Sequence, residues 1–154
     1  MTSAIAATRP VNPPDAQPVL TEKHLWRGLE YRARNPALFL PNVPASKMIT
    51  DGGNKIVQEL TVKNEDQTET EVLTETIQAY PSTIMYHEVS NGLRIVTVVS
   101  RGAAGELLLT FSFANRELPA GKPKPTPEEE NARIGKILEK TIAMFREMVS
   151  EGKL

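Results

Sequence analysis

The sequence predicts an α+β fold in which a strongly curved antiparallel sheet of about six or seven strands wraps around one long C-terminal helix. Residues 47–117 contain six runs with the pattern of strands, and short turn-forming stretches separate them. Residues 126–152 instead repeat apolar side chains at helical spacing. Because each strand needs an apolar partner for one of its faces, the helix is expected to pack against the sheet.

The composition limits both the size and the class of the protein. With 154 residues, the chain is expected to form one domain over residues 1–154. The 18 Lys and Arg side chains nearly balance the 19 Asp and Glu side chains, so neither nucleic acid nor a membrane is an expected partner. The lack of cysteine excludes disulfides and thiolate nucleophiles. Without a spanning apolar run or a secretory signal pattern, we expect a soluble cytoplasmic protein.

The first third of the chain is predicted to contain a strand, an ordered connector and a helix pair. Residues 2–12 favour a short strand, and the proline-rich stretch 11–19 favours an extended connector rather than a flexible linker. Thr21 is expected to cap a helix whose apolar side chains recur at helical spacing, namely Leu25, Trp26, Leu29 and Ala33. Pro36 ends or kinks this helix, and residues 36–41 are predicted to form a second short helical turn.

The middle of the chain is predicted to be a six-stranded meander. Short, turn-forming stretches such as "DGGN", "NEDQ" (64–67) and "RGAAG" separate the strands, and Asn91-Gly92 is the strongest hairpin signal. Such short connections join antiparallel neighbours. The predicted strands are 47–50, 55–63, 68–80, 83–89, 93–100 and 105–117.

The last element is predicted to be a helix over residues 127–150. Thr126 is its expected N-cap, Pro127 its first helical residue, and Glu129 completes the pattern of a capping box. Gly152 is the expected C-terminal stop. The apolar stripe that would face the sheet consists of Ile134, Ile137, Leu138, Ile142, Phe145, Met148 and Val149.

Four segments resemble a known family. They are "NPP" at 12–14, "PVLT" at 18–21, "LWRGLEYRARNP" at 25–36 and "GELLLTFSF" at 105–113. These segments look like the fungal AtaL-like branch of the SRPBCC superfamily, which includes START and birch-pollen-allergen proteins. The resemblance covers nearly the whole chain and implies the helix-grip fold with an internal cavity. Superfamily members bind lipids, sterols, polyketides and plant hormones, and some are aromatase or cyclase components. The AtaL-like branch further implies a ligand from fungal natural-product biosynthesis.

Two polar residues interrupt the apolar faces of neighbouring strands. Glu75 lies between Leu73 and Ile77 on one strand face, so it is expected to enter the cavity, with a raised pKa and a role as general acid or base. The alternative is a twist or bulge that leaves Glu75 in water. Gln58 shares a face with Ile56 and Leu60, and it either enters the same pocket or pairs with a backbone group at a bulge.

The stretch 80–88 holds a further set of polar candidates. If Ile84 and Tyr86 face inward, Glu88 joins them and His87 faces out, because neighbouring strand residues alternate faces. Tyr86 is therefore a second catalytic candidate. No ligand spacing predicts a metal site, and without a nucleotide fingerprint or a cofactor lysine context no cofactor is expected.

The expected ligand-binding surface combines these polar groups with apolar ones. Trp26 either packs in the core or touches the ligand at the cavity mouth, and Arg94 either clamps an anion or lies in solvent. The predicted ligand contacts are Trp26, Gln58, Leu73, Ile77, Glu88, Arg94, Phe111, Ile142 and Phe145.

These expectations favour a cyclase or isomerase that acts on a hydrophobic polyketide- or peptide-derived intermediate. In that interpretation Glu75 is the base, and Tyr86 or Gln58 donates to a developing oxyanion. A carrier that binds the same small molecule without chemistry is the alternative. A third possibility is an interaction protein whose helix stripe packs on a partner, for which a filled core is expected.

Overall fold

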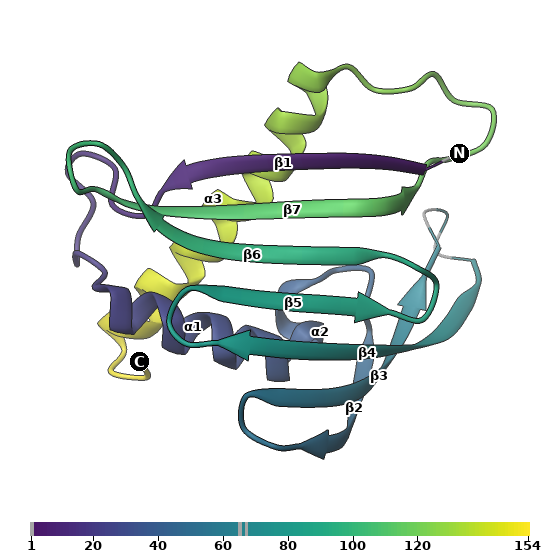
Figure 1. The fold of residues 1–154 in the computed structure, drawn as a ribbon, viewed down its shortest axis with the longest axis horizontal. Helices are drawn as coiled ribbons and strands as arrows, with labels where there is room; N and C mark the ends of the chain where they lie inside the picture. The colour runs from purple at the N-terminus through teal and green to yellow at the C-terminus, as the bar shows by residue number, and fades with distance from the viewer. Residues whose placement is uncertain (1, 65, 67) are drawn as a thin grey trace.

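The computed structural model describes residues 2–64, 66 and 68–154, which form a seven-stranded sheet with helices on one face (Figure 1). The elements in chain order are β1 (Thr2–Pro10), α1 (Glu22–Arg34), α2 (Pro36–Phe39), β2 (Ala45–Asp51), β3 (Lys55–Lys63), β4 (Thr70–Tyr80), β5 (Ile84–Val89), β6 (Arg94–Arg101), β7 (Leu107–Glu117) and α3 (Pro127–Ser150). The helix-grip arrangement that the sequence predicts is therefore confirmed.

The sheet is antiparallel throughout, in the order β1-β7-β6-β5-β4-β3-β2. Strands β2 to β7 form the predicted meander, and β1 joins it by pairing with β7. β1 has nine residues and lies within the stretch 2–12, where the sequence predicts a strand. Residues 65 and 67 of the expected turn 64–67 lie outside the described residues.

Helix α3 runs diagonally across the sheet, mainly over β1 (Figure 1). Its stripe faces the core as predicted, with Ile134, Leu138, Ile142 and Phe145 buried. At its start the backbone N–H of Glu129 donates to Thr126 Oγ1 (3.2 Å), which confirms the cap. No reciprocal bond from the Glu129 side chain is present among the described residues, so the capping box is only half formed.

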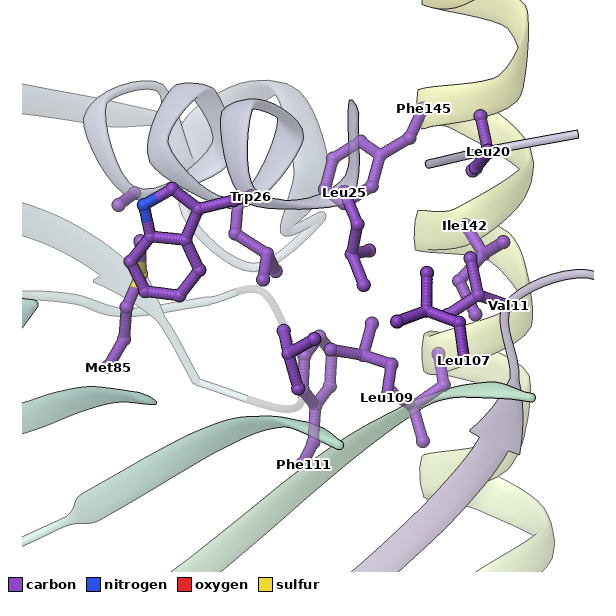
Figure 2. Close-up of a cluster of buried hydrophobic side chains, with 14 of the residues drawn as sticks. Val11, Leu20, Leu25, Trp26, Met85, Leu107, Leu109, Phe111, Ile142 and Phe145 are labelled. Carbon is purple, nitrogen blue, oxygen red and sulfur yellow. The ribbon is translucent and has the colours of Figure 1, made fainter. Parts of the chain in front are cut away.

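Helix α1 places its own apolar face against α3 and the sheet. Thr21 caps it with a full capping box, in which His24 takes the place usually held by Glu or Gln. Gly28 lies directly beneath the Phe145 ring, where an added Cβ would approach the ring carbons to 2.7–2.8 Å. Figure 2 shows α1, α3 and β7 contributing to one apolar cluster, which includes Trp26, Phe111 and Phe145.

The proline-rich connector between β1 and α1 is ordered, as predicted. The Asn12 side chain donates to the Leu20 carbonyl and accepts from the Leu20 N–H, both at 2.8 Å. Arg146 of α3 donates to the carbonyl groups of Val11 and Pro18. These bonds fasten the connector to the C-terminal helix. None of the helices described is long and apolar enough to cross a membrane.

Candidate functional site

A cavity of about 470 Å³ lies between the helices and the inner face of the sheet. This volume is within the range of roughly 300–1,000 Å³ that is usual for small-molecule pockets. Its walls come from α1 and α2, from strands β3 to β7, and from the first turns of α3. Apolar residues make up more than half of its lining, and the remainder includes charged and amide side chains.

A cluster of three buried polar side chains lies at this cavity, in neighbouring strands. Glu75 Oε1 accepts a hydrogen bond from Gln58 Nε2 (2.8 Å), and Glu75 Oε2 is 3.1 Å from His87 Nδ1. The register explains the contacts, because Gln58 lies directly opposite Glu75, while His87 of β5 is opposite Ile77. Glu75 and His87 line the cavity, whereas Gln58 is buried behind them.

The second N–H of Gln58 is also used, since Nε2 donates to the Ala33 carbonyl of α1 at 2.8 Å. A side-chain amide has only two N–H donors, and both are therefore occupied. Gln58 is therefore not free to donate to a ligand oxyanion; of the two alternatives it takes the pairing with a backbone group, although without a bulge. It instead fixes the Glu75 carboxylate and joins β3 to the end of α1.

Glu75 points inward as predicted, but the predicted direction of its pKa shift is wrong. Burial raises the pKa of Glu75, yet the hydrogen bonds and charges around it outweigh that effect and leave the pKa below 4.5. The lowering comes from His87, from the Gln58 amide and from the positive charge of Arg32. The carboxylate is therefore ionised at neutral pH.

Arg32 of α1 also lines the cavity, and its guanidinium lies 4.9 Å from the centroid of the Phe111 ring. Burial lowers the pKa of Arg32 to about 10, against the opposing attraction of Glu75. The side chain still carries its positive charge at neutral pH. Its Nε is buried and unpartnered, and among the described residues Arg32 has no hydrogen bond or ion pair.

The face of strand β5 that carries His87 points into the protein, and the face that carries Tyr86 and Glu88 points outward. The inward orientation predicted for Tyr86 and Glu88 is therefore wrong. Met85, His87 and Val89 are buried, whereas Tyr86 is 43 % exposed. Register is the physical reason: His87 lies opposite the inward-facing Ile77, and directly opposed residues of an antiparallel pair point to the same side. His87 therefore belongs to the site, and Tyr86 lies outside it.

Arg94 belongs to the same outer face. It lies opposite Glu88, and its Nη1 donates to Glu88 Oε1 at 3.0 Å. Both side chains are more than 60 % exposed, so the interpretation of Arg94 as an anion clamp is wrong and its placement in solvent is correct.

The apolar candidates divide between the cavity and the core. Leu73 and Phe111 line the cavity. Four other candidates belong to the packed cluster instead and are not part of the lining: Trp26, Ile77, Ile142 and Phe145. Trp26 is 5 % exposed, and its indole lies near Met85 in Figure 2, which fits the core-packing alternative.

Sequence reasoning missed two residues of the site, His87 and Arg32. A signal for Arg32 was present, because it follows Leu25 by seven positions and Leu29 by three, and so lies on the apolar stripe of α1. A cation on a helix stripe and a carboxylate on an apolar strand face indicate one polar site between them. For His87, the strand pattern alone contained no equivalent signal.

Residues 5–152 match the family described as "AtaL: Acetylaranotin biosynthesis cluster protein L". The chain belongs to the AtaL family. No curated protein matches this AtaL-family chain.

Solved structures share the fold of the AtaL-family chain at low sequence identity. The Zhui aromatase/cyclase from Streptomyces sp. R1128 is 15 % identical, with a TM-score of 0.58 over 97 % of this chain and 96 % of that one. Ara h 8.0201 is 13 % identical, with a TM-score of 0.56 over 98 % and 99 % of the two chains. The di-domain ARO/CYC StfQ from the steffimycin pathway is 13 % identical, with a TM-score of 0.59 over 96 % of this chain and 52 % of its own.

Proposed function

We propose that this AtaL-family protein binds a hydrophobic polyketide- or peptide-derived intermediate in its cavity and promotes cyclisation or isomerisation of that intermediate by moving a proton. The observation that carries the proposal is the Gln58–Glu75–His87 cluster at the cavity wall. The aromatase/cyclase structures with the same fold are consistent with it, and so is a family description that refers to a biosynthetic cluster.

His87 is the proposed acid and base of this cluster. With Glu75 ionised, the ring hydrogen of His87 is held on Nδ1, where it is donated to Glu75 Oε2. This tautomer leaves Nε2 with a lone pair, and no described residue forms a hydrogen bond with Nε2. Nε2 is then the atom that takes a proton from a bound molecule and returns it at another position.

Glu75 is the positioning partner in this scheme rather than the base that the sequence suggested. Its negative charge stabilises the imidazolium that forms when His87 Nε2 accepts a proton, and its hydrogen bond fixes the ring orientation. Gln58 fixes the carboxylate in turn. The cavity excludes water around a ligand and holds it in one conformation, which lowers the entropic cost of ring closure.

A carrier without chemistry is the second candidate, and the apolar part of the cavity lining favours it. Both candidates require the cavity. The third possibility, a protein whose helix stripe packs on a partner, instead predicts a filled core. Carriage and catalysis differ in whether the polar cluster is required after the ligand has bound.

Deletion of the gene in the organism that carries it, followed by profiling of small molecules, tests the proposal. The expected result is accumulation of an uncyclised or spontaneously rearranged intermediate. A carrier predicts a lower yield of the same products. An unchanged profile would contradict both candidates.

A further inference from the structure

The Arg32 guanidinium borders the cavity and has no hydrogen-bond or ion-pair partner among the described residues. It has five N–H donors, and among the described residues none of them forms a hydrogen bond. Removal of a charged group from water without such partners is costly, so buried charges are normally paired. Arg32 is half-buried, with its Nε buried, and it borders the cavity, from which an acceptor can reach the guanidinium.

The nearest carboxylate does not fill this role. Glu75 attracts Arg32 electrostatically, but no hydrogen bond or ion pair joins the two side chains. Glu75 uses its two oxygens for Gln58 and His87. The Phe111 ring approaches the guanidinium at 4.9 Å, which adds cation–π attraction without taking up any N–H donor.

The other cations that line the cavity are placed differently. Arg116 and Arg133 both donate to Glu130, at 2.5 and 2.9 Å. Lys63 lies five positions beyond Gln58 on β3, which puts it about 16 Å along the strand from the polar cluster. Arg116 lies five positions beyond Phe111 on β7, at a similar spacing of about 16 Å from the Phe111 position. Within the described part of the chain, Arg32 is therefore the unpaired cation at the end of the cavity that holds Glu75 and His87.

We propose that Arg32 binds a carboxylate of the ligand, so that the molecule taken up by the cavity is an organic acid with an apolar body. The planar guanidinium matches the two oxygens of a carboxylate, and burial strengthens the bonds. The apolar lining, which includes Leu60, Leu73 and Ile95, accommodates the rest of the molecule. Binding at Arg32 sets the acid beside the Glu75–His87 pair. This inference rests on the proposed function, because it names the chemical class of the ligand of that same cavity.

Two probes with the same ring system test the inference: 2-naphthoate and its neutral analogue 2-acetylnaphthalene. Affinity for the purified protein is measured by calorimetry, and amide chemical shifts of Leu73, His87 and Phe111 report binding in the cavity. The wild-type protein is expected to bind naphthoate about tenfold more tightly than the ketone, or better, as charge-assisted hydrogen bonds would give.

The Arg32→Met variant should lose this preference while it still binds the ketone. Arg32→Lys should retain part of the preference for naphthoate, because lysine keeps the positive charge but lacks the planar guanidinium that bonds both carboxylate oxygens. Arg27→Met, at an exposed position on the same helix, should behave as the wild type. Arg133→Met, at a lining position paired with Glu130, tests whether another cation of the cavity binds the acid. If Arg32→Met does not fold, the ¹³C-carboxyl resonance of naphthoate bound to the wild-type protein supplies the test: it should remain that of an ionised acid well below the pKa of the free acid.

The outcomes separate this inference from the proposed function. Equal binding of the two probes to the wild-type protein would overturn the role of Arg32 and leave the proposed function standing. Loss of the preference in Arg133→Met but not in Arg32→Met would place the acid elsewhere and also overturn the inference. Binding of neither probe would contradict both proposals.

Discussion

Glu75 is a carboxylate on a strand face that otherwise belongs to the core, and the structure explains how the fold tolerates it. The side chain is 6 % exposed, but each of its oxygens has a partner. A buried carboxylate without such partners would be neutral or strongly destabilising. The three-residue cluster is thus a satisfied polar site inside an apolar face.

The Glu75→Gln substitution tests this account through the pH dependence of stability. Because the native pKa of Glu75 lies below 4.5, the unfolded chain takes up a proton at a higher pH than the native protein does. The stability that Glu75 contributes is present above about pH 4.5 and is lost as the pH falls through the native pKa. We expect the free energy of unfolding, measured with urea from about pH 5 to pH 3, to fall less steeply in Glu75→Gln than in the wild type.

Glu88→Gln is the matched control, because it makes the same change on a carboxylate that is 63 % exposed. It should follow the wild-type slope. A Glu75→Gln slope equal to that of the wild type would mean that Glu75 is not held as an ion in the native protein.

The sequence predicts the orientation of Glu75 but not that of His87, and the two strands show why. On β4, Leu73 and Ile77 flank Glu75, and the opposite face is largely polar, so the assignment of faces is clear. On β5 each face has two apolar side chains and one polar one: Met85 and Val89 with His87, or Ile84 and Tyr86 with Glu88. Only the register with β4 decides between these, and the sequence of the connecting turn does not determine that register.

At the scale of elements, the contact between α1 and α3 depends on a residue with no side chain. Gly28 lies against the Phe145 ring, and this contact helps to hold α1, with Arg32 and the Ala33 carbonyl, over the polar cluster. The helical pattern predicts that α1 has an apolar face, but it does not reveal how close the two helices come.

Gly28→Ala should therefore destabilise the protein, although the same change in an exposed helix normally stabilises it by about 0.5–1 kcal/mol. The added Cβ would lie 2.7–2.8 Å from ring carbons of Phe145, so α1 or the ring has to move. A loss of about 1–3 kcal/mol is expected from thermal or urea unfolding. The double variant Gly28→Ala/Phe145→Leu should recover part of the loss, whereas stabilisation by Gly28→Ala alone would contradict the close contact.

At the scale of the whole molecule, the fold is predictable because each element is specified by a sequence pattern that extends over many consecutive residues. The six strand patterns and the capped helix over 127–150 determine the element order, and short turns determine the meander. The lining of the cavity was not predictable in the same way. It depends on α3 packing mainly over β1, which leaves space over β3 to β5, and that placement arises from contacts between distant segments.

The dependence of the sheet on α3 gives a prediction for the whole chain. Deletion of residues 126–154 removes the buried stripe, which includes Ile134, Leu138 and Phe145, and exposes the inner face of the sheet. We expect an insoluble chain or one with molten-globule properties: retained far-UV circular dichroism, lost near-UV signal and binding of a hydrophobic dye. A truncated chain that unfolds cooperatively would show that the sheet does not need the helix.

The most direct measurement of the central claim is small-molecule profiling of the gene-deletion strain complemented with wild type, His87→Gln or Glu88→Gln. If the Glu75–His87 pair moves a proton on the bound intermediate, His87→Gln should accumulate the same intermediate as the deletion strain, with product formation reduced by about 10²–10⁴-fold. Glu88→Gln should restore the wild-type profile. Full restoration by a folded His87→Gln protein would contradict catalysis at this cluster.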